Sequence, residues 1–486
     1  MRAPSAPPAL LGPELQAYAQ QFVASTREYV HIRREDRLLI LRPNKTHHLN
    51  PTACDLLTTL YAQAEVDVEG VVHEVAGSYA VAPELVAADL GELLQSLERL
   101  LNGDPGRASR VRFTPFNSHE IRYPVLSEIA LTYRCTHRCA FCYADARARG
   151  SRRTEMATEQ VRVVIDRIRD EAKVPTISFT GGEPTVRSDL PELIAYARGK
   201  GMRVNLITNG FKCARPEYVA RLAEAGLHSA QVSLEAASRD IHDAITGRPG
   251  SFARTVQGVR NLRAAGIHTH TNTTICPDNR HCLVELVDFV ADELRHDYLS
   301  LNVVIRTGTA VAQQGPSATV DYSEVGEIVE PVITRARERG VRLVWYSPVP
   351  LCIFNPIVAG LGSNSCAAAD GLLSVAPNGE VLPCSSFERG LGNLLHQPFA
   401  RVWNTRTARY WRRKEFLPPV CAECELQRIC CGACPLYWDE VGGFEELVAA
   451  QGSRPTPRVG RTRRWWREAT WRLKRRAIGR LRGVGL

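Results

Sequence analysis

Hydrophobic and polar positions follow two alternating patterns through the middle of the chain. Between about residues 120 and 347, short runs rich in branched side chains alternate with longer segments whose apolar residues recur every three or four positions. The short runs predict buried strands, and the longer segments predict amphipathic helices. The predicted strands are SEIALTY, TISFT, RVNLIT, SAQVSL, HTHTNTTI and YLSLNVVI.

Six such strand–helix units predict the fold class. Regular alternation of strands and helices favours an α/β fold built on a parallel sheet. We expect this sheet to curl into an open, partial (β/α)6 TIM barrel with its site at the carboxyl ends of the strands. The pattern alone also fits a flat, doubly wound sheet.

The first hundred residues have a different pattern. EYVHIRREDRLLILRPN predicts two strands joined by the polar turn Arg34-Glu35-Asp36, within a small domain over residues 25–103. Asn50 and Pro51 suit the N-cap and first turn of a helix, and two further helices are predicted after it. Residues 1–24 are rich in proline and lack the apolar core of a signal peptide, which predicts a disordered lead-in.

The C-terminal end separates into two regions. Residues 348–443 are rich in cysteine and loops, and residues 444–486 predict a basic, amphipathic tail. From Arg454 onward, twelve Lys and Arg residues stand against one acid, so the net charge of +9 belongs to the tail. Its apolar stripe predicts a helix that makes weak contact with a membrane surface, docks on the body or meets an acidic partner. The competing interpretation is a solvated tail. The chain has no run of about 18 apolar residues, so the sequence predicts no membrane span.

Cysteine spacing indicates metal chemistry. The chain has 15 cysteines, no export signal and tight cysteine clusters, which favours metal ligands in the reducing cytoplasm over disulfides. Cys135, Cys139 and Cys142 follow the first predicted barrel strand. Three thiolates can hold a [4Fe–4S] cubane with one iron open. The alternative at this loop is a zinc site completed by His137.

A glycine motif follows the second predicted strand. Thr180-Gly181-Gly182-Glu183-Pro184 lets the backbone approach a neighbour closely. With the cysteine loop it resembles the radical S-adenosylmethionine (SAM) family. The resemblance implies a catalytic [4Fe–4S] cluster on the three cysteines and a SAM site. By position, the residues that would bind SAM are Gly181, Gly182, Glu183, Thr208, Asn209, Ser233 and Glu235. The alternative for the polar residues is helix capping, and His242 and Asp243 are expected on a solvated helix.

A second cysteine pattern resembles the SPASM extension of radical SAM peptide maturases. It runs Cys366-x12-Gly379-x4-Cys384, then Cys421-x2-Cys424-x5-Cys430-x3-Cys434. The resemblance implies up to two auxiliary [4Fe–4S] clusters, one on Cys366, Cys384 and Cys434 with Cys352, the other on Cys421, Cys424 and Cys430. The family's last cysteine is missing, because no cysteine follows Cys434. The second auxiliary cluster would therefore use another ligand, stay open on one iron or be absent, and the candidate ligands are Asp439, Glu440 and Cys431. A zinc-only module is the alternative.

The N-terminal domain resembles the PqqD-like peptide-binding chaperone, or RiPP recognition element. This implies a three-stranded, winged-helix-like domain that binds a precursor's leader peptide as an added strand. A DNA-binding winged helix is the alternative, but the helix PTACDLLTTLYAQ carries no Lys or Arg, so no nucleic acid partner is expected.

Together these resemblances imply a cytoplasmic radical SAM oxidoreductase. It would cleave SAM reductively to a 5′-deoxyadenosyl radical and modify a ribosomally synthesised precursor peptide, by crosslinking, C–C or C–S bond formation, or oxidation. An electron donor such as a flavodoxin or ferredoxin would be needed. The first alternative is a radical SAM enzyme acting on a small molecule in cofactor or tetrapyrrole biosynthesis. The second is a non-catalytic zinc-binding adaptor.

Overall fold

The computed structural model describes residues 12–41, 45–102, 112–113, 121–146, 154–312, 319–362, 365–422 and 424–452. The chain divides into two compact units, Met1–Val125 and Leu126–Leu486, and each is described by itself. The predicted basic tail from residue 453 onward lies outside the described residues. In the described part of the chain, no helix is long and apolar enough to cross a membrane.

The N-terminal unit contains a four-stranded antiparallel sheet. Its order is β1 (Val30–Arg33), β2 (Leu38–Leu41), β3 (Lys45–His48) and β4 (Arg112–Phe113). The predicted turn is confirmed as a 3-10 turn over Arg34–Asp36. Three strands were expected, and β4 adds a short fourth one.

The helices of this unit are α1 (Pro13–Thr26), α2 (Pro51–Ala62), α3 (Val68–Tyr79) and α4 (Pro83–Leu101). The predicted N-cap is confirmed, because the side-chain oxygen of Asn50 accepts a hydrogen bond from the Ala53 N–H at 2.7 Å. The prediction of a disordered lead-in is wrong for residues 13–24. Helix α1 buries Leu15 and Val23 in one core with α2, α3 and α4, because its apolar residues recur at helical spacing.

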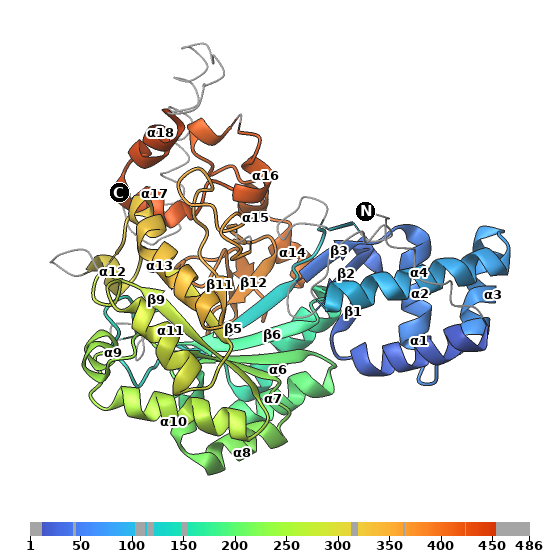
Figure 1. The fold of residues 1–486 in the computed structure, drawn as a ribbon, viewed down its shortest axis with the longest axis horizontal. Coiled ribbons are helices and arrows are strands. Elements are labelled where there is room, and N and C mark those ends of the chain that lie inside the picture. The colour runs from blue at the N-terminus through green and yellow to red at the C-terminus, as the bar shows by residue number, and fades with distance from the viewer. Residues whose placement is uncertain are drawn as a thin grey trace. The chain divides into compact units, whose positions relative to one another are not determined.

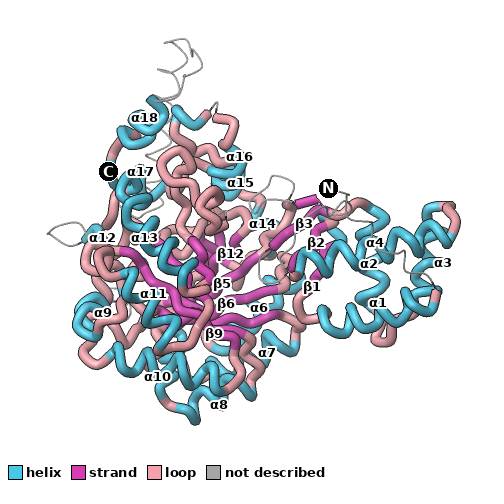
Figure 2. Tube along the Cα trace, viewed as in Figure 1, coloured by secondary structure: helices cyan, strands magenta, loops and turns pink. Residues whose placement is uncertain are grey.

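The C-terminal unit is organised around a ten-stranded sheet (Figures 1 and 2). Seven of its strands are parallel and adjacent in chain order: β5 (Leu126–Thr132), β6 (Thr176–Gly181), β7 (Arg203–Thr208), β8 (Ser229–Ser233), β9 (His268–Ile275), β10 (Tyr298–Val303) and β11 (Arg342–Trp345). A doubly wound sheet would reverse its strand order at a switch point. No reversal occurs between β5 and β11, so the partial barrel is confirmed and the flat alternative is wrong.

Helices connect these strands. They are α6 (Thr158–Asp166), α7 (Leu190–Gly199), α8 (Pro216–Glu224), α9 (Arg239–Thr246), α10 (Ser251–Ala264), α11 (Leu283–Asp292), α12 (Thr309–Ala312) and α13 (Val325–Glu338). Figure 1 shows α7, α8 and α10 along the outer side of the sheet. Each buries an apolar stripe, represented by Leu193, Val219 and Val259.

The cysteine-rich region shares the barrel sheet. Strand β12 (Leu372–Val375) pairs in parallel with β5, and β13 (Glu380–Leu382) and β14 (Gly392–Asn393) continue the sheet in antiparallel fashion. Short helices follow: α14 (Phe399–Trp403), α15 (Arg406–Arg412), α16 (Gln427–Cys430), α17 (Pro435–Val441) and α18 (Glu445–Gly452). Much of this region is loop in Figure 2.

Candidate functional site

The first cysteine triad lies on the loop that follows β5. Cys135, Cys139 and Cys142 are partly buried and in no disulfide. The end of α9 fixes this loop: the Arg138 N–H bonds to the Thr246 carbonyl at 2.9 Å, and the Ala140 N–H bonds to Ile245 at 3.0 Å. The triad therefore sits at the carboxyl ends of the parallel strands, where barrel enzymes place their sites.

The glycine pair at the end of β6 packs against the chain just before Cys135. A Cβ on Gly181 would lie 2.1 Å from the Thr132 carbonyl oxygen, and one on Gly182 would lie 2.5 Å from that of Arg134. The N–H groups of Gly182 and Glu183 bond to these same carbonyls at 2.7 and 2.9 Å. In this structure, the two glycines let the end of β6 approach the cysteine loop closely.

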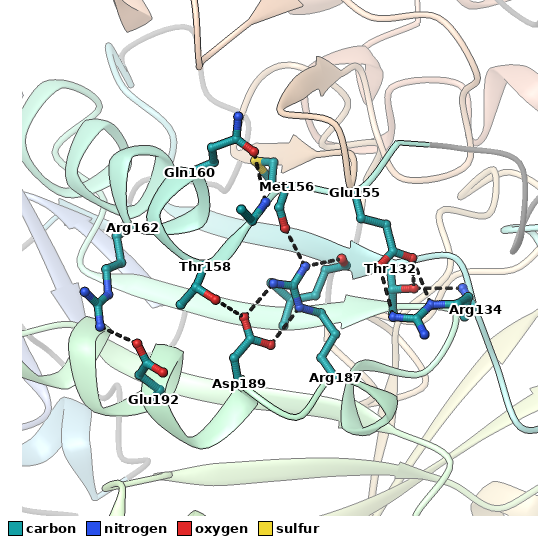
Figure 3. A network of polar contacts seen from close by, with 12 residues as sticks. Thr132, Arg134, Glu155, Met156, Thr158, Gln160, Arg162, Arg187, Asp189 and Glu192 are labelled. Atoms are coloured by element: carbon teal, nitrogen blue, oxygen red, sulfur yellow. Dashed lines mark hydrogen bonds and ion pairs between the residues drawn. The ribbon is translucent and has the colours of Figure 1, made fainter.

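A buried ion pair holds the base of this loop (Figure 3). The Arg187 guanidinium pairs with Asp189 at 2.5 Å and donates to the carbonyl oxygens of Met156 at 2.8 Å and Leu131 at 3.2 Å. These contacts join the end of β5 to the start of α6. Buried charge-assisted hydrogen bonds of this kind make the loop's attachment rigid.

Glu183 links two other predicted site residues. Its carboxylate accepts hydrogen bonds from the Thr185 N–H and hydroxyl, from the Thr208 hydroxyl at 2.7 Å and from the Asn209 N–H at 2.7 Å. Burial raises its pKa, while these hydrogen bonds oppose the rise. The structure therefore brings Glu183, Thr208 and Asn209 together as a network that joins the end of β7 to the glycine motif.

Two further predicted residues, Ser233 and Glu235, lie at and just after the end of β8. Glu235 is 3% exposed and accepts a hydrogen bond from the Thr274 N–H at 2.9 Å. Burial raises its pKa to about 8, and its charge contributes to the raised pKa of the Cys139 thiol. Ser233 is half-buried and pairs in register with Asn272 of β9.

The expectation that His242 lies on a solvated helix is wrong. His242 is fully buried, and its Nδ1 accepts a hydrogen bond from the Glu235 N–H at 3.1 Å. Asp243 instead accepts hydrogen bonds from the N–H groups of Gly250 and Phe252, which hold the loop after α9. The local pattern of charges could not reveal that α9 packs against the cysteine loop.

The second cysteine pattern separates into two groups. The thiols of Cys366 and Cys434 act on the pKa of Cys384, and those of Cys430, Cys352 and Cys424 act on the pKa of Cys421. Burial, followed by these neighbouring thiols, raises the pKa of Cys384 and of Cys421. The resemblance placed Cys352 with the first group; the N–H of the preceding residue, Leu351, donates a hydrogen bond to the Cys430 Sγ of the second group at 3.3 Å. The additional Cys431 lies beside Cys366 and Lys414.

Comparisons with known proteins identify these regions. Residues 129–290 match the radical SAM superfamily, and residues 366–425 match the SPASM iron–sulfur cluster-binding domain. The chain therefore carries a radical SAM domain and a SPASM domain, the two modules of a radical SAM enzyme. Its cofactors are [4Fe–4S] clusters and SAM.

Three relatives illustrate the range of this enzyme class. The chain is 28% identical to an AdoMet-dependent heme synthase of Nitratidesulfovibrio vulgaris, over 67% of this chain and 92% of the relative. It is also 28% identical to a PqqA peptide cyclase of Xanthomonas axonopodis pv. citri, over 64% and 82%. The fold matches Streptococcus suis SuiB, solved with its precursor peptide SuiA, with a TM-score of 0.62, 16% identity and coverage of 85% and 96%.

The donor set of this radical SAM enzyme fits the catalytic cluster. Three thiols lie on one buried loop, and burial raises the pKa of Cys135 to about 12, so these groups need a cation to become thiolates. Both ring nitrogens of His137 are buried in the same loop without a hydrogen-bond partner among the described residues. Buried polar atoms without a hydrogen-bond partner are expected where a bound group supplies the missing contact.

The zinc alternatives find little support in the geometry. Among the described residues, no group of three His, Cys, Asp or Glu side chains is close enough to hold a single metal ion. His137 packs edge-on against Phe211, with ring centroids 5.6 Å apart. A cubane spreads its ligands over separate irons, so it does not need three thiols to converge on one ion as a mononuclear site does.

Two supports of the cysteine loop were missed in the sequence. A Cβ on Gly308 would lie 2.3 Å from the Cys142 carbonyl oxygen, and one on Gly247 would lie 2.8 Å from that of Arg138. The Thr309 N–H also bonds to the Cys142 carbonyl at 3.1 Å. The sequence does show a glycine shortly after β10 and another after α9, but it does not show which distant segment each glycine contacts.

Proposed function

We propose that this radical SAM enzyme modifies a ribosomally synthesised precursor peptide. The observation that carries the proposal is the separate N-terminal unit, which has its own apolar core and an antiparallel sheet with edge strand β1. The match to SuiB, a protein solved with a precursor peptide, is longer than the C-terminal unit and therefore extends into this first unit. The PqqA peptide cyclase relative also favours a peptide substrate.

In this proposal, Cys135, Cys139 and Cys142 hold the catalytic cluster. When bound, the reduced cluster supplies an electron to SAM, whose cleavage provides a radical able to abstract hydrogen from an unactivated carbon. The chain's own residues bind and orient these groups. Gly181 and Gly182 let the glycine motif approach the loop, and Glu183 fixes its position through Thr208 and Asn209.

Ser233 and Glu235 would form the opposite side of the SAM site. Glu235 is buried with a raised pKa, so it is held neutral near neutral pH and can donate a hydrogen bond. The buried ends of β7 and β8 would exclude water from the reacting groups. The SPASM cysteines Cys352, Cys366, Cys384, Cys421, Cys424, Cys430 and Cys434 would hold the auxiliary clusters.

The partners follow from the same proposal. A leader peptide would add as a strand to the sheet edge of the N-terminal unit, where β1 is an outermost strand. A small redox protein, such as a flavodoxin or ferredoxin, would supply the electron. All 15 cysteines lie outside disulfides, which favours the reducing cytoplasm as the location.

The test uses the reconstituted full chain with SAM, dithionite and a synthetic peptide encoded by a short reading frame beside the gene. We expect 5′-deoxyadenosine together with a peptide that has lost two hydrogens, as a crosslink or oxidation requires. The variant Cys135→Ala/Cys139→Ala/Cys142→Ala should yield neither product. Its matched control, Cys54→Ala/Cys213→Ala/Cys282→Ala, changes three cysteines outside the proposed sites and should yield both. Production of 5′-deoxyadenosine by the first variant would refute the cluster assignment.

The heme synthase relative favours a second candidate, a porphyrin substrate. The same assay separates the two, with an iron porphyrin in place of the peptide. Conversion of the porphyrin without any change in the peptide would replace the proposed function with this one.

A further inference from the structure

The second SPASM group has three cysteines from one compact segment. Cys421 ends a 3-10 turn, the Cys424 N–H bonds to the Cys421 carbonyl at 3.2 Å, and Cys430 ends α16. Three thiolates would leave one iron of a cubane open. No cysteine lies between Cys434 and Leu486, so a fourth ligand for this cluster would come from elsewhere in the fold.

A turn from a distant part of the chain closes on this segment. The Leu351 N–H donates a hydrogen bond to the Cys430 Sγ at 3.3 Å, across 79 residues of sequence. Cys352 follows directly and interacts electrostatically with Cys421. The turn is held in place, because the N–H groups of Ile353 and Phe354 both bond to the Pro350 carbonyl. Phe354 also packs edge-on against Trp345, at the end of β11.

Two of the other candidates are less well placed. Cys431 adopts a left-handed conformation with φ of 52°, directly after Cys430, and is 2% exposed. It lies beside Cys366 and Lys414, within the other cysteine group. Glu440 is exposed on α17. A thiolate is also a softer ligand than a carboxylate and is preferred by iron–sulfur clusters.

We propose that Cys352 is the fourth ligand of the second auxiliary cluster, together with Cys421, Cys424 and Cys430. This assignment completes that cluster without the missing downstream cysteine and withdraws Cys352 from the cluster of Cys366, Cys384 and Cys434. It rests on the SPASM cofactors of the proposed function but not on the identity of the substrate.

The experiment introduces Cys352→Ala into two parents, each lacking one group. Parent one carries Cys366→Ala/Cys384→Ala/Cys434→Ala, and parent two carries Cys421→Ala/Cys424→Ala/Cys430→Ala. Each parent should hold about 8 irons per chain after anaerobic reconstitution, at four per cubane. Iron content and the electron paramagnetic resonance (EPR) spectrum of the reduced protein are the readouts. Cys282→Ala, another partly buried cysteine, is the matched control in both parents.

In parent one, Cys352→Ala should lower the iron content to about 4. If three thiolates retain the cluster, its EPR signal should change instead, and added 2-mercaptoethanol should restore the parent's spectrum by supplying the missing thiolate. In parent two, the same substitution should change neither readout. Loss of iron in parent two, or no change in either parent, would overturn the assignment. The peptide assay is separate, so its failure would not produce this pattern.

Discussion

The side-chain nitrogen of Asn209 lies 3.8 Å from the Cys135 Sγ and donates a hydrogen bond to it. The same nitrogen donates to the Thr136 hydroxyl at 3.0 Å, so the end of β7 is tied directly to the cysteine loop. A hydrogen bond to a ligating sulfur stabilises negative charge on the reduced cluster and raises its reduction potential.

Asn209→Ala should therefore lower the midpoint potential of the catalytic cluster. The loss of one hydrogen bond predicts a shift on the order of tens of millivolts, with slower SAM cleavage at a fixed donor potential. An EPR-monitored redox titration measures the shift. Asn205→Ala is the control, because Asn205 is on β7, which Asn209 directly follows, and bonds to Ser178 and Ser229 instead. Equal potentials in the wild type and Asn209→Ala would show that this bond does not tune the cluster.

Gly308→Ala should prevent incorporation of the catalytic cluster. The new Cβ would meet the Cys142 carbonyl oxygen at 2.3 Å, so the cysteine loop would have to move. Iron content should fall by about 4 per chain. Gly250→Ala is a matched control, because Gly250 also has a positive φ but nothing within 4 Å of its Cβ position. The Gly250→Ala variant should have a free energy of unfolding lower by about 1 to 2 kcal/mol, because its backbone is strained, and its iron content should be unchanged. Normal iron content in Gly308→Ala would contradict the steric argument.

His270 should make the protein sensitive to mild acid. It is 8% exposed on β9, stacks on Tyr298 at 4.7 Å, and its ring nitrogens have no hydrogen-bond partner among the described residues. Burial, helped by His268, His296 and Arg342, lowers its pKa to about 3. Above pH 6.5 the ring is neutral in both the folded and the unfolded chain, so it does not lower the free energy of unfolding there. As pH falls from 6.5 towards 3, the free energy of unfolding decreases, because only the unfolded chain takes up the proton.

His270→Phe keeps the ring stacking and removes this titration. Below pH 6.5 the free energy of unfolding of the wild type should fall by up to about 1.4 kcal/mol per pH unit through this group, and that of the variant should not. Thermal unfolding at pH 7.5 and 5.5 compares the two, with the exposed His281→Phe as control. An identical acid shift of the melting temperature in the wild type and His270→Phe would contradict the prediction.

Deletion of the chain from Arg454 onward should leave SAM cleavage intact, because every proposed cluster ligand precedes that residue. The deletion removes twelve basic residues, so binding to anionic vesicles should fall, and binding by the full chain should weaken as salt rises. Co-sedimentation with vesicles measures both effects. Equal binding with and without the tail would exclude a membrane role for it.

The sequence by itself determined the order of elements and the type of chemistry. Strand RVNLIT and the turn Arg34–Asp36 were predicted at their observed bounds, because periodicity and turn chemistry are local properties. Cysteine spacing within one loop is also local, so the proposed ligands Cys135, Cys139 and Cys142 could be chosen without a structure. The chemistry predicted from two short motifs agrees with the two matched domains.

Only the tertiary structure decided which distant segments meet. Gly308 and His242 are unremarkable in the sequence, yet one contacts the cysteine loop and the other is buried beside Glu235. Cys352 lies 14 positions before Cys366, and the resemblance assigned it to the cluster of that cysteine, but the fold brings the adjacent Leu351 N–H to the Cys430 Sγ. Contacts of this kind depend on how barrel strands and loops pack over long separations, and no periodicity along the chain encodes them.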